Sequence, residues 1–176
     1  MILTETRIAG LFIVDLAPLA DERGHFARSY CAETFARHGI RFAPVQCNLS
    51  FNPHQGTLRG LHYQAMPVPD AKLVRCSRGA IFDVAVDLRR DSPTCGAWIG
   101  IELDATNGRA LFVPEGCAHG FQTLKPDSEV FYMMGAPYRA DLARGLRWND
   151  PAFGIAWPGK APRLNARDAA WPDHRA

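Results

Sequence analysis

Short runs rich in β-branched and aromatic residues, separated by Gly, Pro, Asn and Asp, extend over most of the chain. Apolar and polar residues that alternate over such a short run are typical of a strand. We predict strands over residues 11–15, 25–30, 44–50, 57–64, 72–77, 80–88, 97–103, 109–113, 118–124 and 128–134. So many short strands at close spacing favour an all-β sandwich or a small barrel.

One helix stands out, over residues 31–39, because this segment ends on a glycine suited to the position after a helix. From about residue 136 onward the chain is rich in proline and tryptophan, and we expect this tail to wrap the barrel in irregular turns with little helix. No repeat, linker or low-complexity segment divides the sequence, so residues 1–176 are expected to form a single domain.

The clearest predicted hairpin spans residues 72–88 and turns at a glycine. A two-residue loop there would set Val74 opposite Asp83 and Lys72 opposite Ala85. Lys72 and Asp83 would then lie on one face as diagonal neighbours within reach of each other.

An exposed pair of this kind contributes little to stability, and a surface ion pair is one interpretation of Lys72 and Asp83. The other residues expected on their face are Val74, Cys76 and Ile81, all apolar. A charged pair on an apolar face indicates burial or a cleft, which favours a functional role.

The composition is that of an ordinary water-soluble domain, with 47% hydrophobic and 22% charged residues. A net charge of +2 offers no basic field for nucleic acid, and charged residues or glycine interrupt every apolar run before it reaches membrane-spanning length. The N-terminus lacks the order of a signal peptide. Five widely spaced cysteines without a Cys-x-x-Cys pair indicate reduced core thiols of a cytoplasmic protein.

Residues 56–64, Gly-Thr-Leu-Arg-Gly-Leu-His-Tyr-Gln, carry the most chemistry of any predicted strand. Arg59 offers a planar, permanently charged group suited to phosphate, and His62 can act as a base near neutral pH. The alternative is a core histidine and a surface arginine. In a regular strand the two would point to opposite faces, so both can enter one cavity only if the strand bulges, for which Gly60 is the natural place.

Three further candidates are weak when taken singly. His119 lies between small residues after a Pro-Gly turn, and it fits a ligand site or simple packing equally well. Tyr132 shares a strand face with Val130 and Met134, where tyrosine is usually a core residue. Asp168 has the setting of a solvated turn residue.

A metal site is not expected. Such a site needs two or three closely spaced His or carboxylate ligands on adjoining strands. His62 has no second histidine nearby in its strand, and His25, His38 and His54 occur in turn-like or helical settings.

Several segments together resemble the dTDP-4-dehydrorhamnose 3,5-epimerase family of nucleotide-sugar enzymes. The likeness runs in order and spacing over nearly the whole chain, and no single motif decides it. The matching stretches are residues 21–26 (DERGHF), 46–50 (QCNLS), 56–64 (GTLRGLHYQ), 72–76 (KLVRC), 79–89 (GAIFDVAVDLR), 114–121 (PEGCAHGF), 148–151 (WNDP) and 155–158 (IAWP).

The resemblance implies a metal-free cupin-type β-barrel of the jelly-roll kind that needs no cofactor and forms a homodimer by exchanging N-terminal strands. It also implies that His62, paired with Asp168, removes the proton beside the C4 ketone of the sugar. Tyr132 then reprotonates the ring carbon from the opposite face. Lys72 stabilises the enolate oxygen, with Asp83 placing it.

The same resemblance implies how the substrate is held. Arg59 and Arg23 from the partner subunit bind the diphosphate, and His119 lies near the sugar. Phe26 and Tyr138 flank the nucleobase. The remaining residues implied at the substrate pocket are Gln46, Asn48, Arg28 and Arg167.

Some positions depart from the family pattern. Arg28 stands where members that read thymine tend to carry a glutamate, which admits a CDP- or GDP-linked sugar. Met133 and Met134 are more apolar than expected, and Cys117 replaces a bulkier aromatic residue; either change can alter whether C3, C5 or both are inverted.

The sequence therefore predicts an epimerase acting on a nucleotide-diphospho-4-keto-6-deoxyhexose. Two alternatives remain open. One is an enzyme that inverts a single centre or uses another nucleotide's sugar, and the other is a sugar-binding cupin without catalysis, which the presence of an opposed acid and base disfavours.

Overall fold

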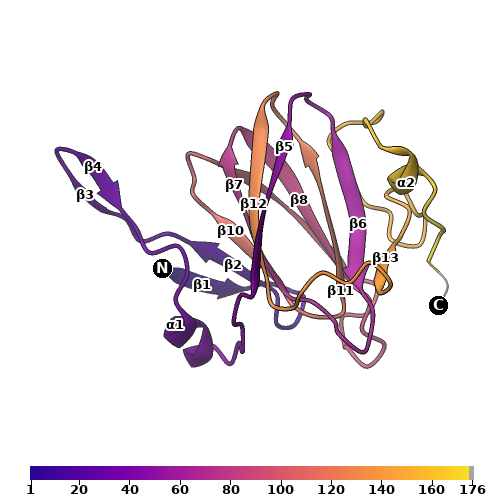
Figure 1. Cartoon of the computed structure of the whole chain (residues 1–176), viewed down its shortest axis with the longest axis horizontal. Coiled ribbons are helices and arrows are strands. Elements are labelled where there is room, and N and C mark those ends of the chain that lie inside the picture. The colour runs from indigo at the N-terminus through magenta and orange to yellow at the C-terminus, as the bar shows by residue number, and fades with distance from the viewer. Residues whose placement is uncertain (175–176) are drawn as a thin grey trace.

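Two antiparallel sheets face each other and enclose the main hydrophobic core in the computed structural model, which describes residues 1–174 (Figure 1). The six-stranded sheet has the order β1 (Ile2–Glu5), β2 (Phe12–Asp15), β10 (Ala110–Val113), β7 (Lys72–Arg78), β12 (Ser128–Met134) and β5 (Gln46–Asn52). The five-stranded sheet has the order β13 (Ala143–Gly145), β6 (Leu58–Gln64), β11 (Cys117–Thr123), β8 (Ala80–Asp87) and β9 (Trp98–Asp104).

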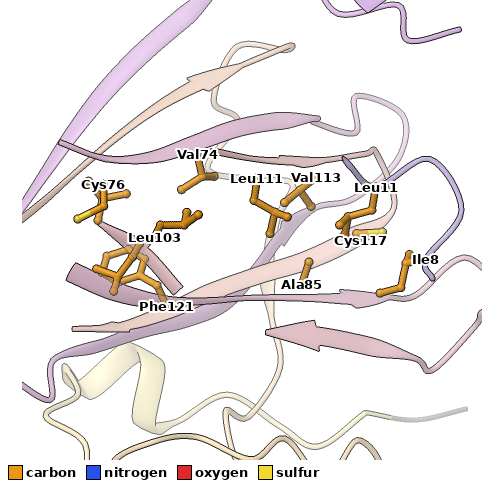
Figure 2. Close-up of a cluster of buried hydrophobic side chains, with 12 residues drawn as sticks. Ile8, Leu11, Val74, Cys76, Ala85, Leu103, Leu111, Val113, Cys117 and Phe121 are labelled. Atoms are coloured by element: carbon orange, nitrogen blue, oxygen red, sulfur yellow. The ribbon is translucent and has the colours of Figure 1, made fainter. Parts of the chain in front are cut away.

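The core lies between the inward faces of these sheets, as Figure 2 shows. Alternate residues of each strand point inward, because successive side chains of a strand lie on opposite faces. Its members include Val74, Cys76, Leu103, Leu111 and Phe121, each at most 4% exposed. Two polar side chains, Asp83 and His119, alternate with members of this core along β8 and β11.

The predicted hairpin of residues 72–88 is wrong. Strand β7 pairs with β10 and β12, whereas β8 pairs with β11 and β9 in the other sheet. Between the strands the chain crosses from one sheet to the other at Gly79, where φ is +74° and a Cβ would lie 2.4 Å from Ser128 Oγ. Alternation grouped the residues of each strand face correctly, but it carries no information on which strands are partners.

The predicted helix is confirmed in shortened form as α1 (Ala32–Arg37), and Gly39 follows with φ +74°. Its buried Phe35 packs against Phe42 and Phe112, so α1 covers part of the outer face of the six-stranded sheet. The outer face of the five-stranded sheet is covered by the tail, which contributes Leu146 and Phe153. As predicted, the tail has little helix, namely α2 (Ala166–Ala169) in the described part.

A small hairpin, β3 (Leu19–Asp21) with β4 (Gly24–Phe26), projects away from the two sheets at the left of Figure 1. Strand β4 ends before the limit of 30 that the sequence predicted. Strands β1, β3 and β13 were missed; each is short and has at most one buried residue, unlike the equally short β2 and β10, which were found.

All five cysteines are free. Cys76 and Cys117 are buried as predicted, but Cys47 and Cys95 are exposed, so the prediction of core thiols is wrong for these two. Within residues 1–174, no helix is long and apolar enough to cross a membrane.

Candidate active site

The bulge predicted in β6 is present. His62 pairs with His119 of β11, yet Arg59, three residues earlier, pairs with Phe121, only two residues later. The additional residue of β6 is accommodated at Gly60, where φ is +137° and a Cβ would lie 2.6 Å from the Cα of Gly120. Because of this bulge, Arg59 and His62 line the same cavity.

His62 is paired with the tail residue Asp168. Its Nε2 lies 2.7 Å from Asp168 Oδ1, and the backbone N–H of Gly60 donates to Asp168 Oδ2 at 3.3 Å. Burial alone would raise the pKa of Asp168, but the hydrogen bonds and the charge of His62 hold that pKa below its ordinary value. The carboxylate is therefore ionised at neutral pH. Just before α2, the Asn165 side chain accepts the backbone N–H of Asp168 and fixes the turn that carries the carboxylate.

Two adjoining cavities, of about 150 and 370 Å³, share three wall residues: His62, Lys72 and Tyr132. The smaller cavity is also lined by Tyr138 and Arg167. The larger one is also lined by the Arg59 and His119 side chains and by residues of the edge strand β5.

Tyr132 faces these cavities from β12, in the sheet opposite to the one that carries His62. It shares the inward face of β12 with Val130 and Met134, both buried. Burial raises the pKa of the Tyr132 hydroxyl, and the nearby Arg59 charge opposes this only in part. The hydroxyl is therefore protonated at neutral pH and can donate a proton.

Lys72 is not held by Asp83, contrary to the prediction. Its Nζ lies 2.6 Å from Asp70 Oδ2, and both side chains are nearly buried. The reason is the crossing between sheets, which places Lys72 and Asp83 in facing sheets. Asp70 comes two residues before Lys72, on the loop that leads into β7.

Asp83 instead pairs with His119, whose Nε2 lies 2.8 Å from Asp83 Oδ1. Burial raises the pKa of Asp83, and the charge of His119 opposes that shift. The second carboxylate oxygen has no hydrogen-bond partner among residues 1–174. His119 is thus anchored from behind while it lines the larger cavity.

Gln46 and Asn48 are not among the residues that line the two cavities, but each contacts a residue that is, Tyr138 and Met134 respectively. Gln46 donates to Asn48 Oδ1 at 3.1 Å and accepts the backbone N–H of Tyr138 at 3.1 Å. Gln46 therefore supports the loop that carries Tyr138, whose ring is half exposed beside the smaller cavity.

Arg23, Phe26 and Arg28 are not brought to the cavities of their own chain. Arg23 and Phe26 lie on the projecting hairpin and Arg28 just after it, all exposed (Figure 1). Arg23 is bound to Asp21 at the hairpin tip, with 2.5 Å between the two charged groups.

Sequence reasoning missed Asn52 and Asp70. Asn52 Oδ1 accepts a hydrogen bond from Arg59 Nε at 2.8 Å and so orients the guanidinium. A signal for Asn52 exists, because Gln46, Asn48, Ser50 and Asn52 alternate with exposed residues along β5 and form a polar inward face. Asp70 gives no such signal, since it lies on an irregular loop.

In the part of the chain that the structure describes, no three His, Cys, Asp or Glu side chains are grouped so that they could hold a metal ion. Three basic side chains at the cavities, those of His62, Lys72 and His119, are each paired with one carboxylate.

The profile of the family described as dTDP-4-dehydrorhamnose 3,5-epimerase matches residues 5–175, nearly the whole chain. The protein belongs to this family. Its members are isomerases. The dTDP-4-dehydrorhamnose 3,5-epimerase of Salmonella typhimurium is 44% identical over 98% of this chain and 94% of its own length.

Solved structures of epimerases share the fold. The Bacillus anthracis dTDP-4-dehydrorhamnose 3,5-epimerase with TDP and PPi bound superposes with a TM-score of 0.94, at 40% identity, over 98% of both chains. ChmJ, a 3′-monoepimerase from Streptomyces bikiniensis in complex with dTDP-quinovose, superposes with a TM-score of 0.88, at 33% identity, over 96% of this chain and 85% of that one. The cupin-type architecture implied by the resemblance is thereby confirmed.

Proposed function

We propose that this protein inverts C3 and C5 of a nucleotide-diphospho-4-keto-6-deoxyhexose, converting dTDP-4-dehydro-6-deoxy-D-glucose to dTDP-4-dehydro-L-rhamnose. The observation that carries the proposal is the position of His62 and Tyr132, which line the same cavities from facing sheets. Inversion of a carbon requires a base on one face of the ring and an acid on the other.

The reaction begins when the imidazole of His62 removes a proton from the carbon beside the C4 ketone. Asp168 supports this step, because its ionised carboxylate stabilises the imidazolium that forms. The electrons of the C–H bond move into an enolate whose negative oxygen is at C4. The Lys72 ammonium stabilises that oxygen and is itself held by Asp70.

Tyr132 completes the inversion by donating its hydroxyl proton to the opposite face of the carbon. The raised pKa of this hydroxyl keeps the proton available at neutral pH. The enolate then returns to the ketone. His62 releases its extra proton to water and Tyr132 regains one, which restores both groups to their starting state. Since the ketone acidifies C3 and C5 alike, the same groups serve both centres after a change in the sugar's position. Every step of this proposed reaction uses protein side chains, and none requires a cofactor.

The substrate is anchored by its diphosphate and its base. Arg59 uses Nε to bind Asn52, which leaves its terminal N–H groups for phosphate oxygens. His119, held by Asp83, contacts the sugar, while Tyr138 stacks on the base and Arg167 completes the smaller cavity.

We also propose a homodimer in which N-terminal strands are exchanged. The hairpin exposes Leu19 and Phe26, which are 73% and 71% exposed. The edge strand β5 exposes Leu49 (66%) and Phe51 (48%) beside the larger cavity. Apolar side chains in such numbers on two exposed elements indicate an interface. In the dimer, the hairpin brings Arg23 from the partner subunit to the diphosphate.

The proposed compartment is the cytoplasm, supported by the five free thiols, two of them exposed.

The test is proton NMR of the protein with dTDP-4-keto-6-deoxyglucose in deuterated water. Deuterium at both C3 and C5, with conversion to the L-rhamno product, is expected. Deuterium at C3 alone would make the protein a monoepimerase, as ChmJ is described. Exchange only with CDP- or GDP-linked sugars would show that the protein recognises a base other than thymine, as Arg28 admits. Exchange with none of these sugars would favour a sugar-binding protein without catalysis.

A further inference from the structure

Trp171, two residues beyond α2, contacts the carboxylate that pairs with His62. Its indole Nε1–H donates to Asp168 Oδ1 at 3.3 Å, and the same oxygen lies 2.7 Å from His62 Nε2. The indole also meets the imidazole edge to face, with ring centroids 6.3 Å apart and an interplanar angle of 69°. Trp171 therefore touches both members of the pair.

The position of Trp171 is fixed by its surroundings. Gly145 of β13, which pairs with His62 of β6, leaves room for the indole: a Cβ at Gly145 would lie 2.2 Å from the ring. The Arg167 guanidinium lies over the indole, 5.1 Å from the ring centroid. The next residue, Pro172, accepts a backbone hydrogen bond from Arg147 at 3.0 Å.

We propose that Trp171 is a positioning residue of the proton-transfer site, which aims the Asp168 carboxylate at His62 and holds Arg167 at the wall of the smaller cavity. Its catalytic consequence rests on the proposed function. The contact itself does not, because it exists in the protein without substrate.

The hydrogen bond from Trp171 to Asp168 weakens the effect of the carboxylate on His62. An N–H that donates to Oδ1 stabilises the carboxylate's negative charge and so reduces the attraction that this charge exerts on an imidazolium. If the donor is removed, the carboxylate attracts the imidazolium more strongly.

Other groups also act on His62. Those that carry or can carry charge around it are Arg59, Lys72 with its partner Asp70, His119, Arg144 and Arg167, together with three tyrosines of the cavity walls. A substitution of Trp171 by Phe changes none of these groups and keeps an aromatic ring against Gly145 and under Arg167. A change in the titration of His62 would therefore report the lost N–H.

The first test compares the pH profiles of kcat/KM for Trp171→Phe and the wild type. We expect the acid limb to move to higher pH by about half a unit, which lowers kcat/KM about threefold below the midpoint. The matched control is Trp157→Phe, which also loses an indole hydrogen bond, from Nε1 to the carbonyl of Trp148 at 2.8 Å, outside the cavities. Its acid limb should coincide with that of the wild type.

The second test needs neither substrate nor a stable variant. In the wild type, the indole Nε1–H resonance of Trp171 should shift with pH at the midpoint at which the His62 ring titrates, both followed by heteronuclear NMR. The proposal would be overturned if the chemical shift of the indole N–H did not change over the pH range in which His62 titrates. It would also be overturned if the pH profiles of Trp171→Phe and the wild type coincided. A protein that inverts no sugar but still shows the coupled titration would refute the proposed function and leave the positioning role intact.

Discussion

Three buried or nearly buried carboxylates each hold one basic side chain at the cavity walls, in the pairs Asp168–His62, Asp70–Lys72 and Asp83–His119. The basic groups line the cavities where substrate would lie; Asp168 and Asp83 do not line them, whereas Asp70 lines the smaller cavity beside Lys72. A charge that is buried without its partner is costly. The pairs therefore fix both the charge and the position of the groups that are proposed to act on the sugar.

The Lys72–Asp70 pair leads to a prediction for stability. Asp70→Asn and Lys72→Met should each lower the free energy of unfolding by about 2–4 kcal/mol, because each leaves one charge without its partner. The double variant should lose less than the sum, with a coupling of at least about 1.5 kcal/mol in urea unfolding.

The control for this cycle combines Lys72→Met with Asp83→Asn. These losses should add to within about 0.5 kcal/mol, because the two residues belong to different pairs. Strong coupling of Lys72 to Asp83 and none to Asp70 would contradict the arrangement described here.

At this scale the sequence identified residue types well and partners poorly. His62 and Arg59 stood out because a strand that only had to fold would carry fewer such groups. Asp70 could not be predicted as the partner of Lys72, since the contact depends on the path of a loop. Trp171 follows Asp168 by only three residues, but the sequence does not show their contact, because the place of the indole depends on Gly145 of β13.

Among the elements, β6 shows most clearly how a local irregularity creates a site. A regular strand would send Arg59 and His62 to opposite faces. The bulge at Gly60 turns both toward one cavity, and the Cα of Gly120 lies so close that only glycine fits. Gly60 and Gly120 weaken the strands locally, but they allow the arrangement of the functional groups.

Gly60→Ala should therefore strongly reduce both stability and activity. With φ at +137° and a Cβ 2.6 Å from backbone, we expect a loss of about 3–5 kcal/mol, a fall in Tm of about 10 °C, and loss of turnover. Gly96→Ala is the matched control, since its φ is +80° but nothing lies within 4 Å of the added Cβ.

The control should lose only about 1 kcal/mol in calorimetry and retain activity. If Gly60→Ala were as mild as Gly96→Ala, the bulge would not depend on glycine.

The sequence predicted elements better than their pairing. The longer strands were found because alternation is a local property of the chain, and the bulge was found because Gly60 interrupts a strand between two functional residues. The pairing of β7 with β8 was predicted wrongly, because a glycine turn between two strands fits a hairpin and a crossing between sheets equally well. That choice is made by packing against β10 and β12, which lie far away in the sequence.

At the scale of the whole molecule, we propose that the site is shared between two chains. Arg23 and Phe26 lie on a hairpin that stands apart from the cavities of its own chain, although the family resemblance assigns both to the substrate (Figure 1). The sequence implied the dimer through that resemblance alone, because a hairpin of three-residue strands carries too little pattern to reveal where it packs.

Complementation tests this sharing. His62→Ala lacks the proposed base, and Arg23→Ala weakens diphosphate binding in the partner's site, so each homodimer should have low activity at subsaturating substrate. When both chains are unfolded, mixed and refolded together, half of the dimers are mixed and one of their two sites is intact.

The mixture should then recover about a quarter of the wild-type activity, measured by the NMR assay. Activity that stays at the mean of the two single variants would show that each site is built from one chain.

The most direct test of the account concerns the two faces of the sugar ring. The measurement is solvent deuterium incorporation and inversion by Tyr132→Phe, followed by proton NMR alongside the wild type and checked for folding by circular dichroism. The account predicts that deuterium still enters beside the ketone, because His62 and Asp168 are untouched, while inversion falls by about 10²–10⁴-fold. Inversion at the wild-type rate, or loss of exchange together with inversion in a folded protein, would contradict the assignment of His62 and Tyr132 as opposed base and acid.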